Sequence, residues 1–540
     1  MGASKIRLET LVDLVEHRCA ASPDATVYTL LDDGVEADRL TCRHLWQRTR
    51  EVAAGLQQST TPGERVLLLY PTGLEFVVAL FGSAAAELVA VPAPPPDLNR
   101  LQRTLPRLMS MIRDSEPTLV LAAPAVIRGL RQLVAETPEL AALRWRSLSE
   151  VEAAAGDWKR PELAADSLAY LQYTSGSTAS PKGVMVSHAN LLHNSRSIRD
   201  AWRYGPDSID VSWVPHFHDD GLVHGIVQPL FCGGRSYLMD PMSFVGRPAR
   251  WLEAISRFRA THSGGPDFAY VLAARKVTKA QRAELDLSSW RLAYNAAEPV
   301  RSETLEAFSK AFEPQGFDRR AFFPSFGMAE TTLLVSTARW DMPPTTLAID
   351  PAALERDQRV VPETGGRTFV GCGLPVQETD IVIARPETCE RCGPDEVGEV
   401  WIRGGGVASG YWRNPEATEE AFGGRLSGAP QSGDLQSGDE QSGNGQSVRY
   451  LRTGDLGFLR DGELFITGRR KDLIIIRGRN LYPQDIESTA VASHPALRPG
   501  CGAAFGVEAG GEERLVVVQE ASDRAPLDID DLAQTVRRKL

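Results

Sequence analysis

A loop rich in hydroxyls and glycines, Tyr173-Thr-Ser-Gly-Ser-Thr-Ala-Ser-Pro-Lys-Gly183, is the segment whose residue types point most directly to chemistry. It follows an apolar run and precedes a predicted helix over residues 187–202. Hydroxyl donors, a glycine backbone and one mobile cation are what a bound polyphosphate needs. Because Lys182 is followed by glycine rather than by Ser or Thr, the loop is not a Walker A motif. A plain Ser/Gly linker is the alternative interpretation.

A second polar segment, Trp213-Val-Pro-His-Phe-His-Asp-Asp-Gly-Leu222, gathers His216, His218, Asp219 and Asp220. A neutral imidazole in this segment is suited to orienting or polarising a carboxylate. A metal site is the competing interpretation, but these side chains have neither the helical i,i+4 spacing nor a distant partner ligand.

Carboxylates stand in two further short blocks. Phe326-Gly-Met-Ala-Glu-Thr331 carries Glu330, and carboxylate oxygens are the protein ligands that Mg²⁺ prefers. Phe326 itself is suited either to an adenine face or to core packing. Tyr450-Leu-Arg-Thr-Gly-Asp-Leu-Gly457 carries Asp455, which can accept hydrogen bonds from both hydroxyls of a ribose. Taken alone, Glu330 is also compatible with a surface acid and Thr-Gly-Asp with a common turn, so a nucleotide with its Mg²⁺ is what the resemblance described next implies.

Together with Gly468-Arg-Arg-Lys-Asp472, these blocks resemble, in order, the conserved segments of the adenylate-forming superfamily of acyl-CoA synthetases, peptide-synthetase adenylation domains and luciferases. The resemblance implies that an acid and ATP form acyl-AMP and pyrophosphate. It implies catalytic roles for His218, Glu330 and Lys182, with Glu330 also holding Mg²⁺, and a domain hinge at Lys471. The implied ATP-binding residues are Thr174, Ser175, Gly176, Ser177, Thr178, Lys182, Asn295, Ala296, Ala297, Glu298, Phe326, Gly327, Met328, Ala329, Glu330, Thr331, Asp455 and Arg469.

The acyl side is similar to the fatty acyl-AMP ligases within that superfamily. The Phe-Asp-x-Ser context of amino-acid adenylation domains is absent. Similar segments are Val91–Pro96, Arg247–Trp251, Thr261–Tyr270, Asn295–Pro299 and Arg477–Pro483. The resemblance implies a fatty acid as substrate, with an acyl-binding set made of His218, Asp219, Gly264, Gly265, Asp267 and Phe268.

Residues 337–367 mix Pro, Thr and charge around a short helical stretch, Pro351–Asp357, and are predicted to be a surface insertion. In fatty acyl-AMP ligases an insertion here is thought to hinder the rotated state that coenzyme A needs. The resemblance therefore implies transfer to the phosphopantetheine thiol of an acyl carrier protein in lipid, polyketide or nonribosomal peptide synthesis. An acyl-CoA synthetase, or a non-catalytic fragment that binds ATP or acyl-AMP, are the alternatives.

The sequence departs from the pattern of that subfamily in three places. Asp220 and His224 stand where small or apolar residues are usual, which affects the length and polarity of the acyl group. Ala296 replaces a usual glycine near the adenine. The family's final lysine does not precede Lys539-Leu540, so we expect a fragment of a longer assembly-line protein or a weakened activity.

Apolar strand-like runs alternate with helical patterns, which predicts an α/β fold with largely parallel sheets. The predicted strands are Arg65–Tyr70, Leu119–Ala122, Leu168–Tyr173, Arg235–Met239 and Val397–Ile402, with helices over Glu75–Ala86 and Leu101–Asp114. We expect a large adenylation domain of several subdomains over residues 1–470 and a small, truncated C-terminal α+β domain over 471–540. The repetitive stretch 423–447 has almost no apolar side chains and is predicted to be a loop without chemistry.

Composition limits the class of protein. The formal net charge is -11 and 42% of residues are hydrophobic, which favours a globular protein and argues against nucleic acid as the main partner. Seven irregularly spaced cysteines favour a reducing cytoplasm, and the single Cys389-x-x-Cys392 pair is more typical of a loop than of a metal knuckle. No stretch approaches the roughly 20 apolar residues of a membrane helix.

Overall fold

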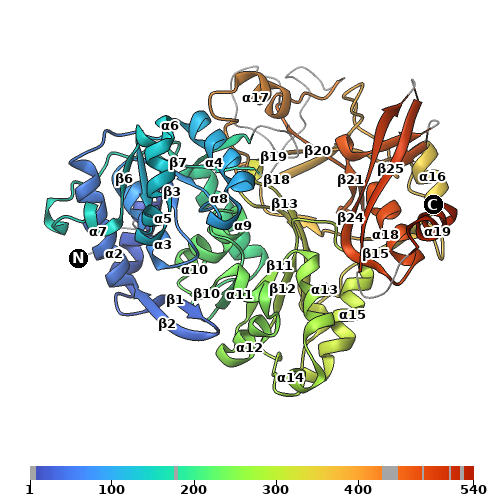
Figure 1. The fold of residues 1–540 in the computed structure, drawn as a ribbon, viewed down its shortest axis with the longest axis horizontal. Coiled ribbons are helices and arrows are strands. Elements are labelled where there is room, and N and C mark those ends of the chain that lie inside the picture. The colour runs from blue at the N-terminus through green and yellow to red at the C-terminus, as the bar shows by residue number, and fades with distance from the viewer. Residues whose placement is uncertain are drawn as a thin grey trace, which may run out of the picture.

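The computed structural model describes residues 8–174, 181–427, 448–476, 479–509, 512–522 and 528–539. Its largest sheet has nine strands in the order β17-β14-β13-β12-β11-β9-β10-β1-β2 (Figure 1). The pairs from β13 through to β1 are parallel, while β14, β17 and β2 join antiparallel. The strands are β1 (Thr26–Asp32), β2 (Val35–Thr41), β9 (Ile209–Ser212), β10 (Arg235–Met239), β11 (His262–Gly265), β12 (Leu292–Asn295), β13 (Phe322–Gly327), β14 (Leu334–Thr337) and β17 (Leu374–Pro375).

A second sheet of six strands has the order β6-β5-β3-β4-β7-β8. It is parallel except for the β7–β8 hairpin. Its strands are β3 (Arg65–Leu69), β4 (Val89–Pro92), β5 (Leu119–Ala122), β6 (Arg144–Arg146), β7 (Leu168–Tyr173) and β8 (Gly183–Ser187). Strands β3, β4 and β5 are almost entirely buried, as continuous apolar runs in a parallel sheet should be.

Helices cover both large sheets, and α3 (Leu74–Ala85) is buried on every side. It packs against α1 (Leu11–Ala21) and α2 (Cys42–Gln57). The other helices before the insertion are α4 (Leu101–Ser115), α5 (Pro124–Glu136), α6 (Pro138–Ala141), α7 (Leu148–Val151), α8 (His188–Ala201), α9 (Asp219–Leu222), α10 (Gln228–Cys232), α11 (Pro241–Gly246), α12 (Ala249–Phe258), α13 (Asp267–Lys276), α14 (Lys279–Ala283) and α15 (Ser302–Phe312). A π-helix, η3 (Val223–Val227), joins α9 to α10.

A third sheet of four strands is antiparallel throughout. It consists of β18 (Thr379–Ala384), β19 (Gly398–Gly404), β20 (Leu451–Arg460) and β21 (Glu463–Arg469), with α17 (Pro415–Phe422) beside it. The prediction of largely parallel sheets therefore holds for the two large sheets and is wrong here. Two β-hairpins and two helices follow, drawn in red in Figure 1: β22 (Ile474–Ile476), β23 (Arg479–Leu481), α18 (Pro483–Ser493), β24 (Leu497–Ala509), β25 (Glu512–Ala521) and α19 (Ile529–Lys539).

The insertion forms ordered structure that packs against the C-terminal elements. It contains β15 (Thr346–Ile349) and α16 (Pro351–Asp357), and its last residue begins β16 (Arg367–Val370); the helix has the predicted bounds. Ile349 and Leu354 are fully buried in one cluster with Phe458, Phe465 and Tyr482. The expected surface insertion is therefore partly core, because its apolar side chains are covered by the sheet that follows and by the start of α18.

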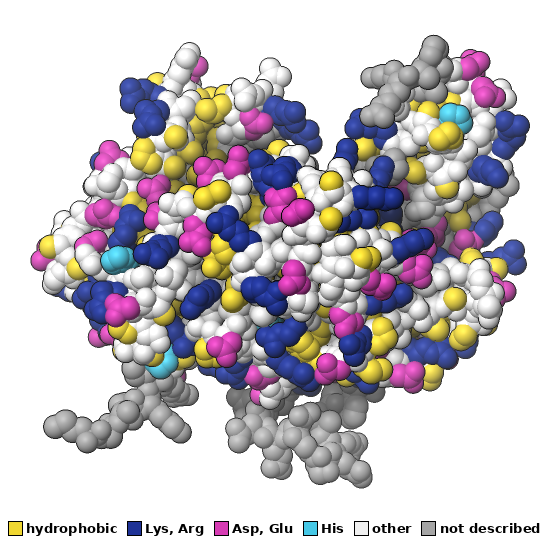
Figure 2. Space-filling view, turned by 90° about the horizontal axis from the view of Figure 1, so that it is seen from below, with side chains coloured by type: hydrophobic (Ala, Val, Ile, Leu, Met, Phe, Trp, Pro, Cys, Tyr) yellow, Lys and Arg dark blue, Asp and Glu magenta, His cyan; other side chains and the backbone are white. Residues whose placement is uncertain are grey.

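The low-complexity prediction for 423–447 falls mainly on residues outside those the structure describes, since only 423–427 are included. All seven cysteines are free. Charged side chains of both signs are interspersed on the face seen in Figure 2. Among the described residues, every helix is too short or too polar to cross a membrane.

Candidate active site

Four of the predicted site segments lie at one edge of the nine-stranded sheet. Strands β9, β11, β12 and β13 are parallel neighbours, so their carboxyl ends meet at this edge. The segments that leave it are 213–219, 264–268, 295–298 and 326–331. Ligands of open α/β sheets bind outside the carboxyl ends of the strands. The topology therefore gathers residues that are more than one hundred positions apart.

The Ser/Gly loop connects the strands of a hairpin. Its two ends are joined where the Thr174 amide donates to the Lys182 carbonyl at 3.3 Å. Ser175, Gly176, Ser177 and Thr178 lie outside the described residues. The helix predicted over 187–202 is present as α8 (His188–Ala201), but the strand β8 lies between it and the loop, because Gly183-Val-Met-Val-Ser187 pairs antiparallel with β7. The N-terminus of α8 is consequently not at the loop.

Tyr411 links this loop to Glu330. The Lys182 ammonium lies 4.7 Å from the centre of the Tyr411 ring, which is cation–π distance. The hydroxyl of the same tyrosine donates to Oε1 of Glu330 at 2.8 Å. The Glu330 carbonyl also accepts from the Ala408 amide at 2.9 Å, which fixes the segment against the tyrosine's own loop.

Electrostatics connect Glu330 to the other predicted groups. Burial raises the pKa of Glu330, the Tyr411 hydrogen bond lowers it, Asp219 raises it and Arg469 lowers it. Both Asp219 and Arg469 therefore lie close enough for their charges to act on Glu330. A phosphate chain with a divalent cation would meet carboxylates and cations here in close proximity.

Asp455 and Arg469 form a pair on the neighbouring strands β20 and β21. Nε of Arg469 donates to Oδ1 of Asp455 at 3.1 Å, and the two residues are register partners. Burial raises the pKa of Asp455 to about 6, against the lowering effects of Arg469 and Lys471. The predicted hinge residue Lys471 is exposed and lies in the turn just after β21.

His218 contacts the carboxylate of Asp219 through Nδ1. This carboxylate raises the pKa of His218 to about 9, more than burial lowers it. The buried Asp219 beside the ring thus favours the charged imidazole, whereas the Asp220 amide, which donates to Nδ1 at 3.4 Å, favours the neutral ring that the sequence predicts.

Asp267 is used inside the fold. Its carboxylate accepts from Nδ2 of Asn295 at 2.9 Å and from the Thr304 hydroxyl at 2.7 Å, so it locks α13 to β12 and α15. The Phe268 amide donates to the Glu298 carboxylate. This hydrogen bond joins the start of α13 to the segment that follows β12.

The two glycines of β11 allow close packing. A Cβ at Gly264 would lie 2.2 Å from the Tyr294 carbonyl oxygen, and one at Gly265 would lie 2.6 Å from the Trp213 ring. Ala297 has φ 68°, a left-handed conformation that strains a residue with a Cβ. The predicted adenine segment thus includes one strained residue, Ala297. It follows Ala296, which stands where the resembled family usually has glycine. Phe326 is partly buried and packs on the core of the four-stranded sheet.

Residues 15–412 match the family model described as AMP-binding enzyme. The chain belongs to this family. A medium-chain-fatty-acid–[acyl-carrier-protein] ligase, JamA, of Moorena producens is 46% identical over 99% of this chain and 89% of its own length. A second ligase of that description, TtuA of Teredinibacter turnerae, is 33% identical over 95% of this chain and 84% of its own.

A solved fatty acyl-adenylate ligase from L. pneumophila, in complex with acyl adenylate and pyrophosphate, has the same fold. It is 37% identical, the match covers 99% of this chain and 91% of the solved chain, and the two superimpose with a TM-score of 0.80. The predicted resemblance to fatty acyl-AMP ligases and the predicted α/β fold class are therefore confirmed. The roles of individual site residues and the division near residue 470 stay predictions.

Magnesium is compatible with the groups at this edge of the nine-stranded sheet. Oε1 of Glu330 accepts a hydrogen bond from the Tyr411 hydroxyl. Its second oxygen, Oε2, accepts no hydrogen bond from the described residues. Within the described part of the chain, no group of three or more His, Cys, Asp or Glu side chains could hold a metal alone. Such a sparse donor set suits Mg²⁺, which keeps its waters and binds phosphates with one or two carboxylates.

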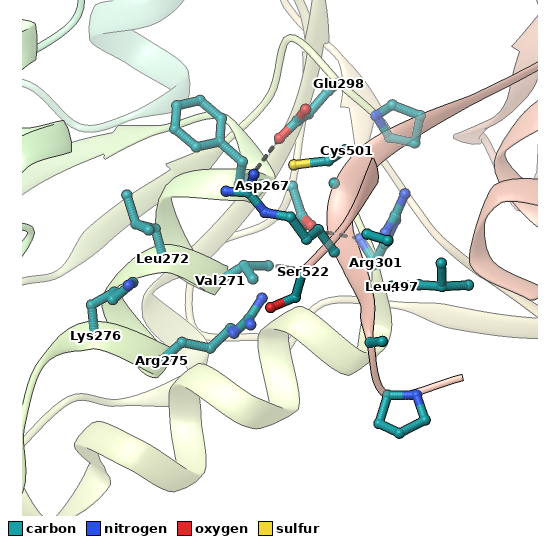
Figure 3. Close-up of a pocket in the computed structure, with 17 residues that line it drawn as sticks. Asp267, Val271, Leu272, Arg275, Lys276, Glu298, Arg301, Leu497, Cys501 and Ser522 are labelled. Atoms are coloured by element: carbon teal, nitrogen blue, oxygen red, sulfur yellow. Dashed lines mark hydrogen bonds between the residues drawn. The ribbon is translucent and has the colours of Figure 1, made fainter. Parts of the chain in front are cut away.

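A cavity of about 990 Å³ lies apart from Glu330, between α13 and the strand β24 of the C-terminal region (Figure 3). Asp267, Phe268 and Glu298, three predicted site residues, are in its wall. Figure 3 shows Arg275 and Lys276 on α13 on one side and Leu497 and Cys501 on the other. Neither Glu330 nor Asp455 lines it.

The residue that sequence reasoning missed is Tyr411. It stands in Ser409-Gly-Tyr-Trp412, a short aromatic loop with no acid, base or phosphate-binding pattern. Two cues could have suggested it: the aromatic pair itself, and its position between two predicted site blocks. The pairing partner, Glu330, is 81 positions away.

Proposed function

We propose that this AMP-binding enzyme adenylates a medium-chain fatty acid with ATP and passes the acyl group to the thiol of a phosphopantetheinylated acyl carrier protein. The observation that carries the proposal is the contact series Lys182–Tyr411–Glu330 at the sheet edge that also holds His218 and Asp219. The relatives' described activities support the same substrate class and partner. Such an enzyme would work in the cytoplasm, where its free cysteines stay reduced.

The reaction needs positioning and charge neutralisation rather than a protein nucleophile. A carboxylate oxygen of the fatty acid attacks the α-phosphorus of ATP. An acyl O–P bond forms, the P–O bond to the β-phosphate breaks, and pyrophosphate leaves with that electron pair. No proton needs to move.

Each group has a proposed part in that step. Thr174 and Lys182 hold the β- and γ-phosphates, and Tyr411 keeps the lysine and Glu330 in place. Asp455 binds the ribose hydroxyls. The imidazolium of His218 attracts the acid's carboxylate and stabilises negative charge at the acyl phosphate.

Glu330 would hold Mg²⁺, supported by its incompletely used carboxylate in a half-buried position. The ion supplies charge neutralisation to the phosphate oxygens when it is bound. Burial raises the pKa of Glu330, and the Tyr411 hydrogen bond and the Arg469 charge oppose this effect.

The insertion supports a carrier protein rather than coenzyme A as acceptor. Glu355 on α16 pairs with the Arg479 guanidinium, and its carbonyl accepts from Nδ2 of Asn480 at 3.0 Å. Arg367 pairs with Asp485 and lies 4.6 Å from the centre of the Tyr482 ring. These contacts tie the C-terminal elements to the insertion, so rotation of that region requires breaking them.

The test is pyrophosphate release from ATP with fatty acids of graded length, with and without coenzyme A and a holo carrier protein. We expect acid-dependent release, and acyl-AMP that the carrier discharges and coenzyme A does not. Deletion of residues 337–367 should permit discharge by coenzyme A. Efficient acyl-CoA formation by the intact chain would favour an acyl-CoA synthetase, and no release with any acid would contradict adenylation.

A further inference from the structure

A cluster of buried polar side chains lies directly behind His218 and Asp219. His224 on the π-helix is fully buried, and its Nε2 lies 3.4 Å from Oδ1 of Asp210, which is also fully buried, on β9. On the other side of the same ring, Nδ1 lies 3.8 Å from Oδ1 of Asp220. The imidazole therefore stands between two carboxyl groups in the interior.

Aromatic rings surround that imidazole. The Tyr204 hydroxyl is 2.8 Å from Nε2 of His224. The ring centres of Trp202 and Tyr294 lie 5.3 Å and 4.7 Å from that of His224, both edge-on. Trp202 and Tyr294 also stack on each other at 5.3 Å. His224 consequently fills a box that would otherwise be hollow, and its orientation is fixed.

Two polar atoms of the cluster lack a hydrogen-bond partner among the described residues. They are Nδ1 of His224 and Oγ of Ser212. A buried polar group without a partner destabilises the fold, because it has lost its hydrogen bonds to water. If these side chains only filled space, apolar side chains of similar volume would stabilise the fold more. A cluster of this kind beside a predicted active site therefore points to a ligand.

Asp220 connects the cluster to the acyl side of the site. It is the first residue after Asp219, and its side chain keeps 12% exposure, whereas those of His224 and Asp210 keep 1% and 0%. Tyr294, whose hydroxyl interacts with Asp220, packs on the other side against Gly264, one of the predicted acyl-binding residues. Asp220 is thus the outermost member, at the boundary between the cluster and the proposed acyl site.

We propose that Asp220, backed by His224, forms a polar end to the acyl pocket, which binds a hydroxyl or amino group carried on the chain of the acid. This rests on the proposed adenylation and narrows its substrate class from plain fatty acids to acids with a hydrogen-bonding substituent. A buried carboxyl group can accept from either donor. Burial also raises the pKa of Asp220 to about 7, so its carboxyl is partly protonated near neutral pH and can donate as well as accept.

The experiment compares six-carbon acids that are equal in length and differ only in one substituent: unsubstituted, hydroxy- and amino-hexanoic acids with the group at each carbon from C3 to C6. The readout is kcat/KM from pyrophosphate release. We expect at least one substituted acid to exceed hexanoic acid about tenfold or more, because an unfilled polar site rejects the analogue that lacks the group. Comparing the hydroxy acids with the amino acids shows whether the site prefers a neutral or a cationic substituent.

Asp220→Leu should reverse this ratio, so that hexanoic acid becomes the better substrate, and Asp220→Asn should keep a preference for a hydrogen-bonding group. Because each ratio is taken within one variant, a loss of overall activity does not mask it. Thermal unfolding of each variant shows whether it folds. If Asp220→Leu does not fold, the preference of Asp220→Asn still tests the inference. A wild-type ratio near one for every substituent would overturn the inference while leaving adenylation intact. No release with any acid would overturn both.

Discussion

The hydroxyl of Tyr411 donates to Oε1 of Glu330 at 2.8 Å while its ring supports the Lys182 ammonium at 4.7 Å. One side chain thereby positions both the proposed Mg²⁺ ligand and the proposed phosphate cation. Removing only the hydroxyl, with Tyr411→Phe, keeps the ring under the lysine and raises the pKa of Glu330 further. We expect KM for MgATP to rise about tenfold, which corresponds to the loss of roughly 1.4 kcal/mol for a hydrogen bond to a charged group.

Steady-state pyrophosphate release over a range of MgATP concentrations measures this effect. Tyr411→Leu should raise KM for MgATP further, because it also removes the cation–π contact with Lys182. The matched control is Tyr450→Phe, which removes a hydroxyl bonded to Asp380 at 3.1 Å on the four-stranded sheet. Equal KM values for wild type and Tyr411→Phe would contradict the positioning role.

The contact between His218 and Asp219 predicts a dependence on pH. The folded-state pKa of His218 is about 9, above its ordinary value of 6.5. The stabilising contact is therefore complete below pH 6.5 and is lost as pH rises through about 9. Asp219 acts in the opposite direction: its pKa is lowered, so its contribution is lost only as pH falls below its ordinary value of 3.8.

We expect pyrophosphate release to decline as pH rises past about 9. Asp219→Asn should move this decline to lower pH, because burial then lowers the pKa of His218 without the opposing carboxylate. An NMR titration of the imidazole signal, assigned with His218→Gln, measures the pKa directly. A wild-type signal that titrates at or below 6.5 would show that the ring is neutral during turnover.

Local patterns predicted local structure well. The predicted bounds are correct for strands β5, β7 and β10 and for helix α16. Each strand is a short apolar run, and the helix begins with a proline. The candidate site was predicted from blocks whose order resembled a family. The Tyr411–Glu330 contact could not be predicted in this way, because it joins residues 81 positions apart through the packing of two different sheets. The antiparallel sheet was missed because its strands carry no periodicity distinct from that of parallel strands.

Arg367 provides a test of how the insertion holds the C-terminal region. Its guanidinium pairs with Asp485 on α18 and lies over the Tyr482 ring. Asp485 is partly exposed, so water screens the ion pair and Arg367→Ala should loosen the docking by about 1–2 kcal/mol. We expect faster hydrogen exchange in α18 and a measurable gain in acyl-CoA formation.

Arg385→Ala is the control for that variant, because Arg385 pairs with Glu390 and Glu396, residues of the connection before β19. It should change neither α18 exchange nor acyl-CoA formation. If Arg367→Ala speeds α18 exchange without any gain with coenzyme A, docking of this region does not decide the acceptor.

His224 predicts the depth of the acyl pocket. The ring fills the space between Trp202, Tyr204 and Tyr294, so His224→Gly should open that space and shift the preferred acid to longer, unsubstituted chains. Loss of a fully buried side chain should also destabilise the fold by about 2–4 kcal/mol, which thermal unfolding measures. Pyrophosphate release with acids of increasing length gives the optimum.

The control for this change is His188→Ala. His188 is equally buried, but it lies on α8 and accepts from the Leu11 amide at 3.3 Å. It should destabilise the fold without moving the optimum, because its ring faces α1 rather than the acyl side. An unchanged optimum in a folded His224→Gly variant would mean that the acyl chain takes another direction from His218. In that case the cavity beside α13 becomes the next candidate for the chain.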